Sequence, residues 1–237
     1  MKRDNEEGRQ VMKRKMELLE GRIIPRRIVT PVPPSRIKKD LERYRTMALE
    51  MGAADTAIIP SKEILIDERV RAKCMFPRCR SYGTSMNCPP FAPDLDFTRR
   101  LVARYRSAVL FCVKGSREHF AGEDQAKFQK EKDETKFLFN RICSEIESRA
   151  FYDGYHLSLA FGHGTCKSLW CPDVPCAGLE TGKGCRFPLK SRSSMEAVGM
   201  DVFTMAARRG WEIYPVAERV DVAKTPHVLL VGLILIV

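Results

Sequence analysis

The chain has 237 residues, of which 44% are hydrophobic and 30% are charged, and its formal net charge is +11. This composition is ordinary for a globular protein and excludes wholesale disorder and a collagen-like fold. The longest apolar stretch falls short of the about 18 consecutive residues that a membrane-spanning helix needs, so we expect no association with a membrane.

The N-terminal residues are highly charged and lack the apolar region of a secretory signal, so we expect a cytoplasmic protein. Four prolines lie between residues 24 and 35, where they favour an extended conformation. We therefore expect a basic extension and proline-rich linker at residues 1–35, followed by one domain at residues 36–237.

Helices and strands alternate along this domain. Apolar residues recur at spacings of three and four after Ser35, which predicts a helix that Ser35 caps and Gly52 ends. The further expected elements are a strand at 56–59, a helix capped by Asp96, a strand at 108–113, a helix at 123–149, a strand at 155–161, a helix at 193–209, and strands at 211–216 and 228–237.

The last of these strands is nearly all apolar, as expected of a strand that is covered on both faces. The alternation of strands and helices predicts an α/β fold in which a mixed sheet is flanked by helices. Two cysteine-rich stretches interrupt the pattern, and we expect them to form metal-binding loops held by this scaffold.

Nine cysteines are present, and seven of them lie in these two stretches. Without a secretory signal the thiols stay reduced, so clustered cysteines indicate metal ligands rather than disulfides. We name residues 74–93 the first cysteine segment and residues 162–192 the second. Seven thiolates on metal would offset part of the basic excess, which weakens the net charge as evidence for nucleic-acid binding.

The second cysteine segment contains Cys166, Cys171, Cys176 and Cys185, separated by gaps of four, four and eight residues. Four thiolates suit either Zn²⁺ or an iron–sulfur cluster. Structural zinc sites usually have two-residue gaps between cysteines, whereas these longer gaps and the glycines among them let the chain surround a larger group. We therefore favour an iron–sulfur cluster, of the [4Fe-4S] type, with zinc or an unmetallated loop as the alternatives.

The first cysteine segment contains three thiols, from Cys74, Cys79 and Cys88. Three protein ligands leave one metal position open or require a fourth ligand from elsewhere in the fold. The two segments could also come together and share ligands, so one or two clusters are expected. Cys112 lies in an apolar strand and Cys143 in an apolar helical stripe, so we expect both to pack in the core.

Basic residues lie close to both sets of thiols, and nearby cations stabilise a negatively charged cluster and favour its reduction. These residues are Arg71, Lys73, Arg78 and Arg80 in or beside the first segment, and Lys167, Lys183, Arg186, Lys190 and Arg192 in or beside the second.

No catalytic residue can be assigned. Glu196 fits a capping box with Ser193, and His163 is either a ligand, a donor to sulfur or a loop residue without a role. The sequence contains no phosphate-binding glycine loop and no nucleophile elbow. Whether the protein is an enzyme is therefore left open.

Several motifs resemble the cysteine-rich "predicted metal-binding protein" family (domain of unknown function 2284). They are Val70-Arg71-Ala72-Lys73-Cys74, Cys79-Arg80-Ser81-Tyr82-Gly83, Asn87-Cys88-Pro89-Pro90, Cys185-Arg186-Phe187-Pro188 and the run from Ser194 to Val202. The similarity covers roughly residues 36–237. The resemblance implies metal or iron–sulfur binding in an anaerobic prokaryotic setting and does not imply a particular reaction.

Our leading hypothesis is an iron–sulfur protein of anaerobic metabolism that transfers electrons to a partner metalloenzyme, or takes part in its reductive activation or maturation. The basic surface would attract an acidic partner protein. The alternative is a zinc-stabilised module that binds nucleic acid, which the net charge favours and the low aromatic content of 8% does not.

Overall fold

The computed structural model describes residues 32–180, 184–216 and 221–237. The strands are β1 (Asp55–Pro60), β2 (Ser107–Gly115), β3 (Leu159–Phe161) and β4 (Val228–Leu235). The α-helices are α2 (Pro34–Glu50), α3 (Glu68–Met75), α4 (Leu95–Val102), α5 (Arg117–Phe120), α6 (Gln129–Tyr152), α7 (Lys167–Trp170), α8 (Ala177–Glu180) and α9 (Val202–Ala207). The 3₁₀ turns are η1 (Ser61–Glu63), η2 (Glu123–Phe128), η3 (Glu196–Val198) and η4 (Val222–Lys224).

The four strands form one sheet in the order β1-β2-β4-β3. The α/β class is confirmed, and all three strand pairs are antiparallel. Among the described residues, the parallel pairing expected in a mixed sheet is limited to a single bridge between Gly162 and Ser194. Alternation of strands and helices in a sequence does not fix strand direction, which explains this difference. None of the described helices is long and apolar enough to cross a membrane.

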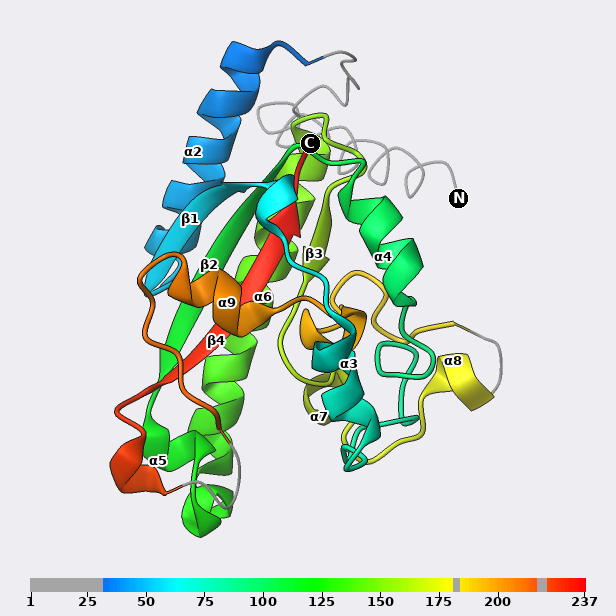
Figure 1. Cartoon of the computed structure of the whole chain (residues 1–237), viewed down its shortest axis with the longest axis vertical. Helices are drawn as coiled ribbons and strands as arrows, with labels where there is room; N and C mark the ends of the chain where they lie inside the picture. The colour runs from blue at the N-terminus through cyan, green and yellow to red at the C-terminus, as the bar shows by residue number, and fades with distance from the viewer. Residues whose placement is uncertain (1–31, 181–183, 217–220) are drawn as a thin grey trace, which may run out of the picture.

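Strand β4 is buried on both faces, as its sequence predicts. Its residues Val228, Leu230 and Ile234 belong to the core on one side of the sheet, which α2 and α6 cover. Val231 and Leu233 alternate with them and belong to the core on the opposite side, which η3, α9 and part of α4 cover. The arrangement of these layers is visible in Figure 1.

The core between α6 and the sheet is tightest around Gly232. Phe111 of β2 lies opposite Gly232 in the register, and its ring packs against Phe139 of α6 with 5.0 Å between centroids. A Cβ atom at position 232 would lie 2.6 Å from the Phe111 ring and 2.7 Å from the Phe139 ring. The two aromatic rings therefore occupy the space that any side chain at position 232 would need.

We expect Gly232→Ala to lower the free energy of unfolding by about 1–3 kcal/mol, because the added methyl group overpacks the core. Gly162→Ala is the control, since a Cβ atom there would meet no atom closer than 3.9 Å. Urea denaturation measures both changes. Equal stability of the Gly232→Ala variant and the parent protein would contradict this description of the core.

Two predicted helix starts are each wrong by two residues. Helix α2 begins at Pro34 with Pro33 as its N-cap, because a proline in the first turn needs no hydrogen-bond partner for a backbone N–H. Ser35 therefore lies inside the helix. Helix α4 is capped by Asp94, whose carboxylate accepts a hydrogen bond from the Phe97 amide at 2.7 Å, and not by Asp96.

The predicted helix at 193–209 is interrupted. Gly199 has a left-handed φ of +81° and separates η3 from α9, which Asp201 caps through the Thr204 amide. The predicted strand at 155–161 is limited to β3, because the chain turns between Tyr155 and Ser158. The predicted strand at 211–216 is wrong, since this segment pairs with no strand in the described part of the chain.

The long helix predicted at 123–149 has different bounds in the structure. Its first residues form η2, and α6 extends to Tyr152. Phe139, Ile142 and Ile146, which recur at the helical period, are buried. Residues 1–31 lie outside the described residues, so the expected N-terminal extension stays a prediction.

Candidate metal centre

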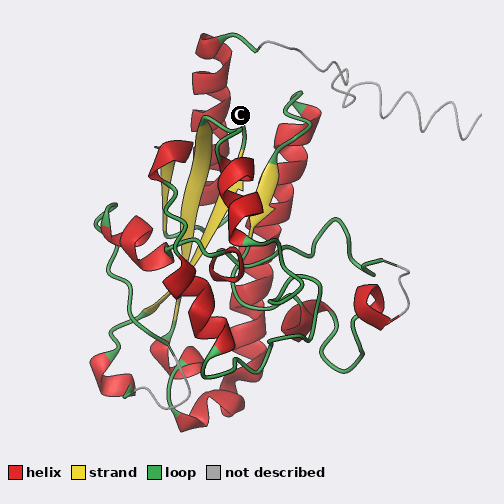
Figure 2. Cartoon of the chain, turned by 45° about the vertical axis from the view of Figure 1, so that its right-hand side comes forward, coloured by secondary structure: helices red, strands yellow, loops and turns green. Residues whose placement is uncertain are grey.

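The two cysteine segments lie side by side (Figures 1 and 2). Figure 2 shows that this part of the molecule consists mostly of loops and very short helices. The Asn87 side chain donates a hydrogen bond to Cys166 Sγ at 3.4 Å, and Cys88 Sγ lies 3.5 Å from Thr165 Oγ1. Asn87, which precedes Cys88, thus contacts Cys166. Thr165, which precedes Cys166, contacts Cys88 in turn.

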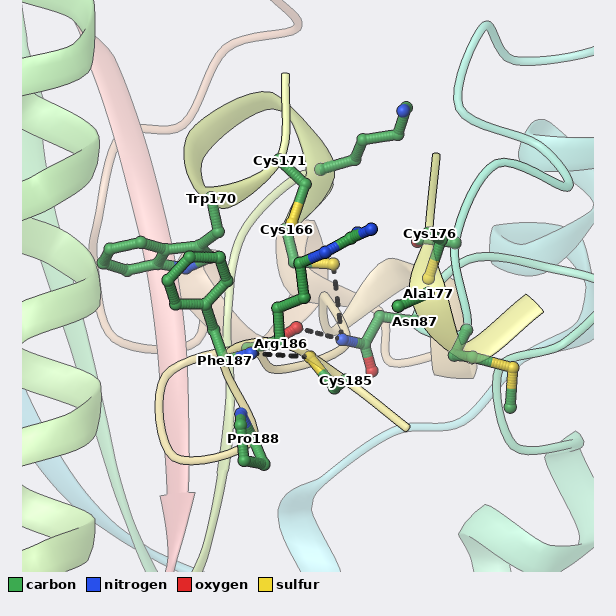
Figure 3. A pocket seen from close by; sticks show the side chains of 14 residues that line it. Asn87, Cys166, Trp170, Cys171, Cys176, Ala177, Cys185, Arg186, Phe187 and Pro188 are labelled. Atoms are coloured by element: carbon green, nitrogen blue, oxygen red, sulfur yellow. Dashed lines mark hydrogen bonds between the residues drawn. The ribbon is translucent and has the colours of Figure 1, made fainter. Parts of the chain in front are cut away.

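The four thiols of the second segment line one cavity of about 240 Å³ (Figure 3). They are those of Cys166, Cys171, Cys176 and Cys185. The first three thiols are half-buried, and that of Cys185 is exposed. Ser85, Met86 and Asn87 of the first segment also line the cavity, although they lie at least 79 positions from Cys166 in the sequence.

The four-residue gap between Cys166 and Cys171 has a local structural cause. Cys166 is the N-cap of α7, and the single turn of that helix brings the chain to Cys171. Cys176 directly precedes α8 and accepts hydrogen bonds at its carbonyl from the Leu179 and Glu180 amides. A single helical turn therefore follows Cys166 and Cys176, in place of the tight two-residue turn between the cysteines of a structural zinc site.

Among the described residues, amide nitrogens donate hydrogen bonds to three of the seven clustered thiols. The Phe187 amide donates to Cys185 Sγ at 3.3 Å, and the Ser81 amide donates to Cys79 Sγ at 3.5 Å. Both bonds run from the second residue after a cysteine back to its sulfur, in the two Cys-Arg turns of the chain. The third is the bond from Asn87 to Cys166. N–H donors of this kind suit a sulfur that carries negative charge, as a metal-ligating sulfur does.

Aromatic rings shield one side of the cavity. Trp170 packs against Phe187 with 5.8 Å between ring centroids, and both residues line the cavity. Phe137 of α6 packs edge-on against Trp170, and Lys190 Nζ lies 5.3 Å from the centre of the indole ring. The buried Trp170 Nε1 has no hydrogen-bond partner in the described part of the chain, which leaves a donor at the cavity wall.

The cations beside the thiols hold the loops in place. Lys167 donates to the Val174 carbonyl at 2.7 Å, and Arg186 donates to the Pro175 carbonyl at 2.6 Å. Arg192 forms an ion pair with Glu147 of α6 at 2.6 Å, which joins the second segment to the core helix. These side chains are structural cross-links as well as positive charges near the cavity. Lys183 lies outside the described residues.

The first segment places its thiols at different depths. Cys74 is half-buried in the last turn of α3, Cys79 is exposed and Cys88 is buried. Burial raises the pKa of Cys74, and the acidic neighbours that raise this pKa further are Cys79, Glu196 and Cys88. Within the described ranges no three Cys, His, Asp or Glu side chains are gathered closely enough to bind a single metal ion. The ligand roles of Cys74, Cys79 and Cys88, and those of the four cysteines of the second segment, therefore stay predictions.

The surroundings of Glu196 differ from those predicted, and His163 contacts the core. The hydroxyl of Ser194, not that of Ser193, accepts the Ala197 amide at 3.1 Å, and the Glu196 carboxylate has no hydrogen bond in the described part of the molecule. The capping box with Ser193 is therefore wrong. His163 packs edge-on against Phe139 at 6.1 Å between centroids, and burial lowers its pKa.

Cys112 and Cys143 are buried in the core, as predicted. Burial raises the pKa of Cys112 to about 11 and also raises the pKa of Cys143. A free cysteine has a pKa of about 8.5, so both core thiols stay protonated over a wider pH range in the folded protein. The stability contributed by Cys112 is complete below about pH 8.5 and is lost as the pH rises through about 11.

We therefore expect iodoacetamide at pH 8 to modify Cys79 and Cys185 of the metal-free folded protein, and to leave Cys112 and Cys143 intact. Peptide mass spectrometry identifies the modified residues, and the same reaction in urea shows that every cysteine can be modified. Modification of Cys112 in the folded protein as fast as that of Cys79 would show that the core is not closed around Cys112.

The sequence did not single out Asn87, Trp170 or Phe187 as parts of the site. In the sequence, Asn87 is one residue of the motif around Cys88. Its contact with Cys166 depends on the tertiary fold. Trp170 directly precedes Cys171, and Phe187 is the second residue after Cys185. These positions beside cysteines are the sequence feature that could have indicated both rings as parts of the site.

Comparison with curated proteins and with solved structures gave no match. The family model described as "Predicted metal-binding protein (DUF2284)" matches residues 57–236. The match includes both cysteine segments and all four strands except the first two residues of β1. It confirms the resemblance inferred from the motifs, and the chain belongs to this family of predicted metal-binding proteins.

Proposed function

We propose that this protein binds an iron–sulfur cluster through Cys166, Cys171, Cys176 and Cys185 and acts as an electron carrier for an acidic partner protein. The observation that supports this proposal most directly is that the four thiols line one cavity. They come from a stretch of twenty residues in which each cysteine starts or ends a turn of the chain.

The size of the cavity favours a cluster over the alternatives. Its volume of about 240 Å³ is many times the roughly 10–15 Å³ that is enough to hold one water molecule, which is more space than a single ion needs. It is also smaller than the about 300–1,000 Å³ of common small-molecule sites. A compact inorganic group with four thiolate ligands, such as a [4Fe-4S] cluster, fits these limits.

The residues around the thiols also fit such a group. Amide donors contact Cys166 and Cys185, and the side chains of Lys167 and Arg186 add positive charge at the cavity. Trp170 and Phe187 exclude water from one side. When bound, an iron–sulfur cluster supplies one-electron transfer at a potential set by hydrogen bonds to sulfur, nearby charge and solvent exposure. All three of these determinants are present in the surroundings of the four thiols.

The surface around the cysteine segments suits contact with another protein. Large apolar side chains are exposed here beside basic ones, namely Met75, Phe76, Met86, Phe91, Val174 and Leu189. Arg78 is also exposed, over the ring of Tyr82. Because the charge of this region is basic, we propose an acidic partner, such as a redox metalloenzyme that receives electrons or is reductively activated or matured.

Purification without oxygen, followed by a visible spectrum and by iron and sulfide analysis, tests the proposal. We expect a brown protein with about four irons and four sulfides per chain, or about eight of each if the first segment holds a second cluster. A colourless protein with stoichiometric zinc would contradict the proposal and favour a zinc-stabilised nucleic-acid-binding module. A protein without metal after anaerobic purification and reconstitution would contradict both.

A further inference from the structure

Asn87 of the first cysteine segment reaches a thiol of the second. Its Nδ2 donates to Cys166 Sγ at 3.4 Å and to Ser191 Oγ at 2.6 Å, and its Oδ1 accepts a hydrogen bond from Ser193 Oγ at 3.1 Å. Both amide hydrogens and the carbonyl oxygen of Asn87 are therefore used. Asn87 also lines the cavity that the four thiols share (Figure 3).

The two serines fix the orientation of this amide. Ser193 follows Arg192, whose ion pair with Glu147 attaches this part of the chain to α6, and the Ser193 carbonyl accepts the Gly162 amide at 2.8 Å. With Ser193 donating to Oδ1, the NH₂ group faces Cys166. A flipped amide would place its oxygen against the sulfur, and two electron-rich acceptors repel each other when the sulfur is a thiolate.

We propose that Asn87 is a positioning residue that raises the reduction potential of the cluster by donating a hydrogen bond to Cys166 Sγ. This inference rests on the proposed function. Reduction adds negative charge that is shared by the ligating sulfurs, so a donor to one of those sulfurs stabilises the reduced state more than the oxidised state. Asn87 provides this donor from outside the second segment without adding charge.

The test uses anaerobically purified protein and measures iron, sulfide and the midpoint potential by a redox titration followed by visible absorption and electron paramagnetic resonance. The variants are Asn87→Ala, which removes the donor, and Asn87→Asp, which also adds a negative charge. Ser193→Ala leaves Asn87 in place but removes the group that orients it. Asn140→Asp is the matched control, because Asn140 donates to the Lys136 carbonyl within α6 and lines no part of the cavity.

One hydrogen bond to a charged acceptor corresponds to roughly a tenfold change in an equilibrium constant. We therefore expect Asn87→Ala to make reduction about tenfold less favourable, which is a potential lower by about 59 mV for a one-electron couple. Asn87→Asp lowers the potential further, Ser193→Ala lowers it by less, and Asn140→Asp leaves it unchanged.

The outcomes separate this inference from the proposed function. Parent protein without iron and sulfide contradicts the proposed function itself. Parent and Asn87 variants with equal iron and equal potentials overturn the role of Asn87 and leave the cluster assignment intact. If Asn87→Asp does not retain its cluster, Asn87→Ala and Ser193→Ala still report the potential. Loss of iron from all three variants would also overturn the inference, since the amide would then be needed for binding.

Discussion

We expect Cys166→Ser to abolish binding of the proposed iron–sulfur cluster. Replacing even an outer group that only orients a ligand typically weakens metal binding by about 10–100-fold, so loss of a thiolate ligand has at least this effect. We expect the iron content to fall by about four atoms per chain, the complement of one cluster. Cys171→Ser, Cys176→Ser and Cys185→Ser give the same result, because all four thiols line the same cavity. Iron and sulfide analysis after anaerobic purification measures the loss.

Cys143→Ala is the matched control for these variants. Cys143 is fully enclosed by the core, and its thiol has no access to the cavity that the other four share. The control therefore keeps its full iron content while losing one cysteine. A Cys166→Ser protein that retains all its iron, or a Cys143→Ala protein that folds but has none, would show that the ligands have been assigned wrongly.

Phe139→Ala destabilises the whole domain by about 3–5 kcal/mol. The Phe139 ring is buried between the sheet and the second cysteine segment, since it contacts Phe111 on one side and His163 on the other. The substitution removes a buried ring that contacts both the sheet and this segment. Urea denaturation of the metal-free protein measures the change in the free energy of unfolding.

Phe137→Ala is the control, because Phe137 lies on the same helix, is 46% exposed and packs against Trp170 at the cavity wall. We expect it to lower the free energy of unfolding by about 1 kcal/mol or less. Similar losses for the two variants would contradict the central position of Phe139 in the core.

The long apolar elements could be predicted from the sequence because burial dictates their pattern directly. Strand β4 is apolar at nearly every position, and it lies between two covered faces. The inward residues of α6 recur at the helical period and are buried. In both elements one dominant effect, the removal of apolar side chains from water, sets the pattern.

Elements with short or mixed signals could not be placed as well. Apolar spacing continues through Gly199, but the left-handed backbone at that glycine divides the predicted helix into η3 and α9. Both Asp94 and Asp96 are good caps by residue type, and the sequence does not say which of the two carboxylates reaches a free amide. Strand direction depends on how the connections pass over the sheet, which local sequence does not encode.

The candidate site also combines features that the sequence predicts with features that only the fold reveals. The spacing of Cys166, Cys171, Cys176 and Cys185 already suggested one group of thiols, because close positions in a chain stay close in a loop. The contribution of Asn87 depends on a contact between residues 79 positions apart, and such a contact requires the fold. Cys79 and Cys88 influence Cys74 electrostatically, and the ligand role of these three cysteines stays a prediction.

A crystal structure of the anaerobically purified protein, with anomalous diffraction recorded at the iron edge, tests the central claim most directly. The account predicts iron density inside the cavity, bonded to the sulfurs of Cys166, Cys171, Cys176 and Cys185. Four cysteine sulfurs around a cavity that holds no iron, in protein that was purified and reconstituted without oxygen, would contradict it.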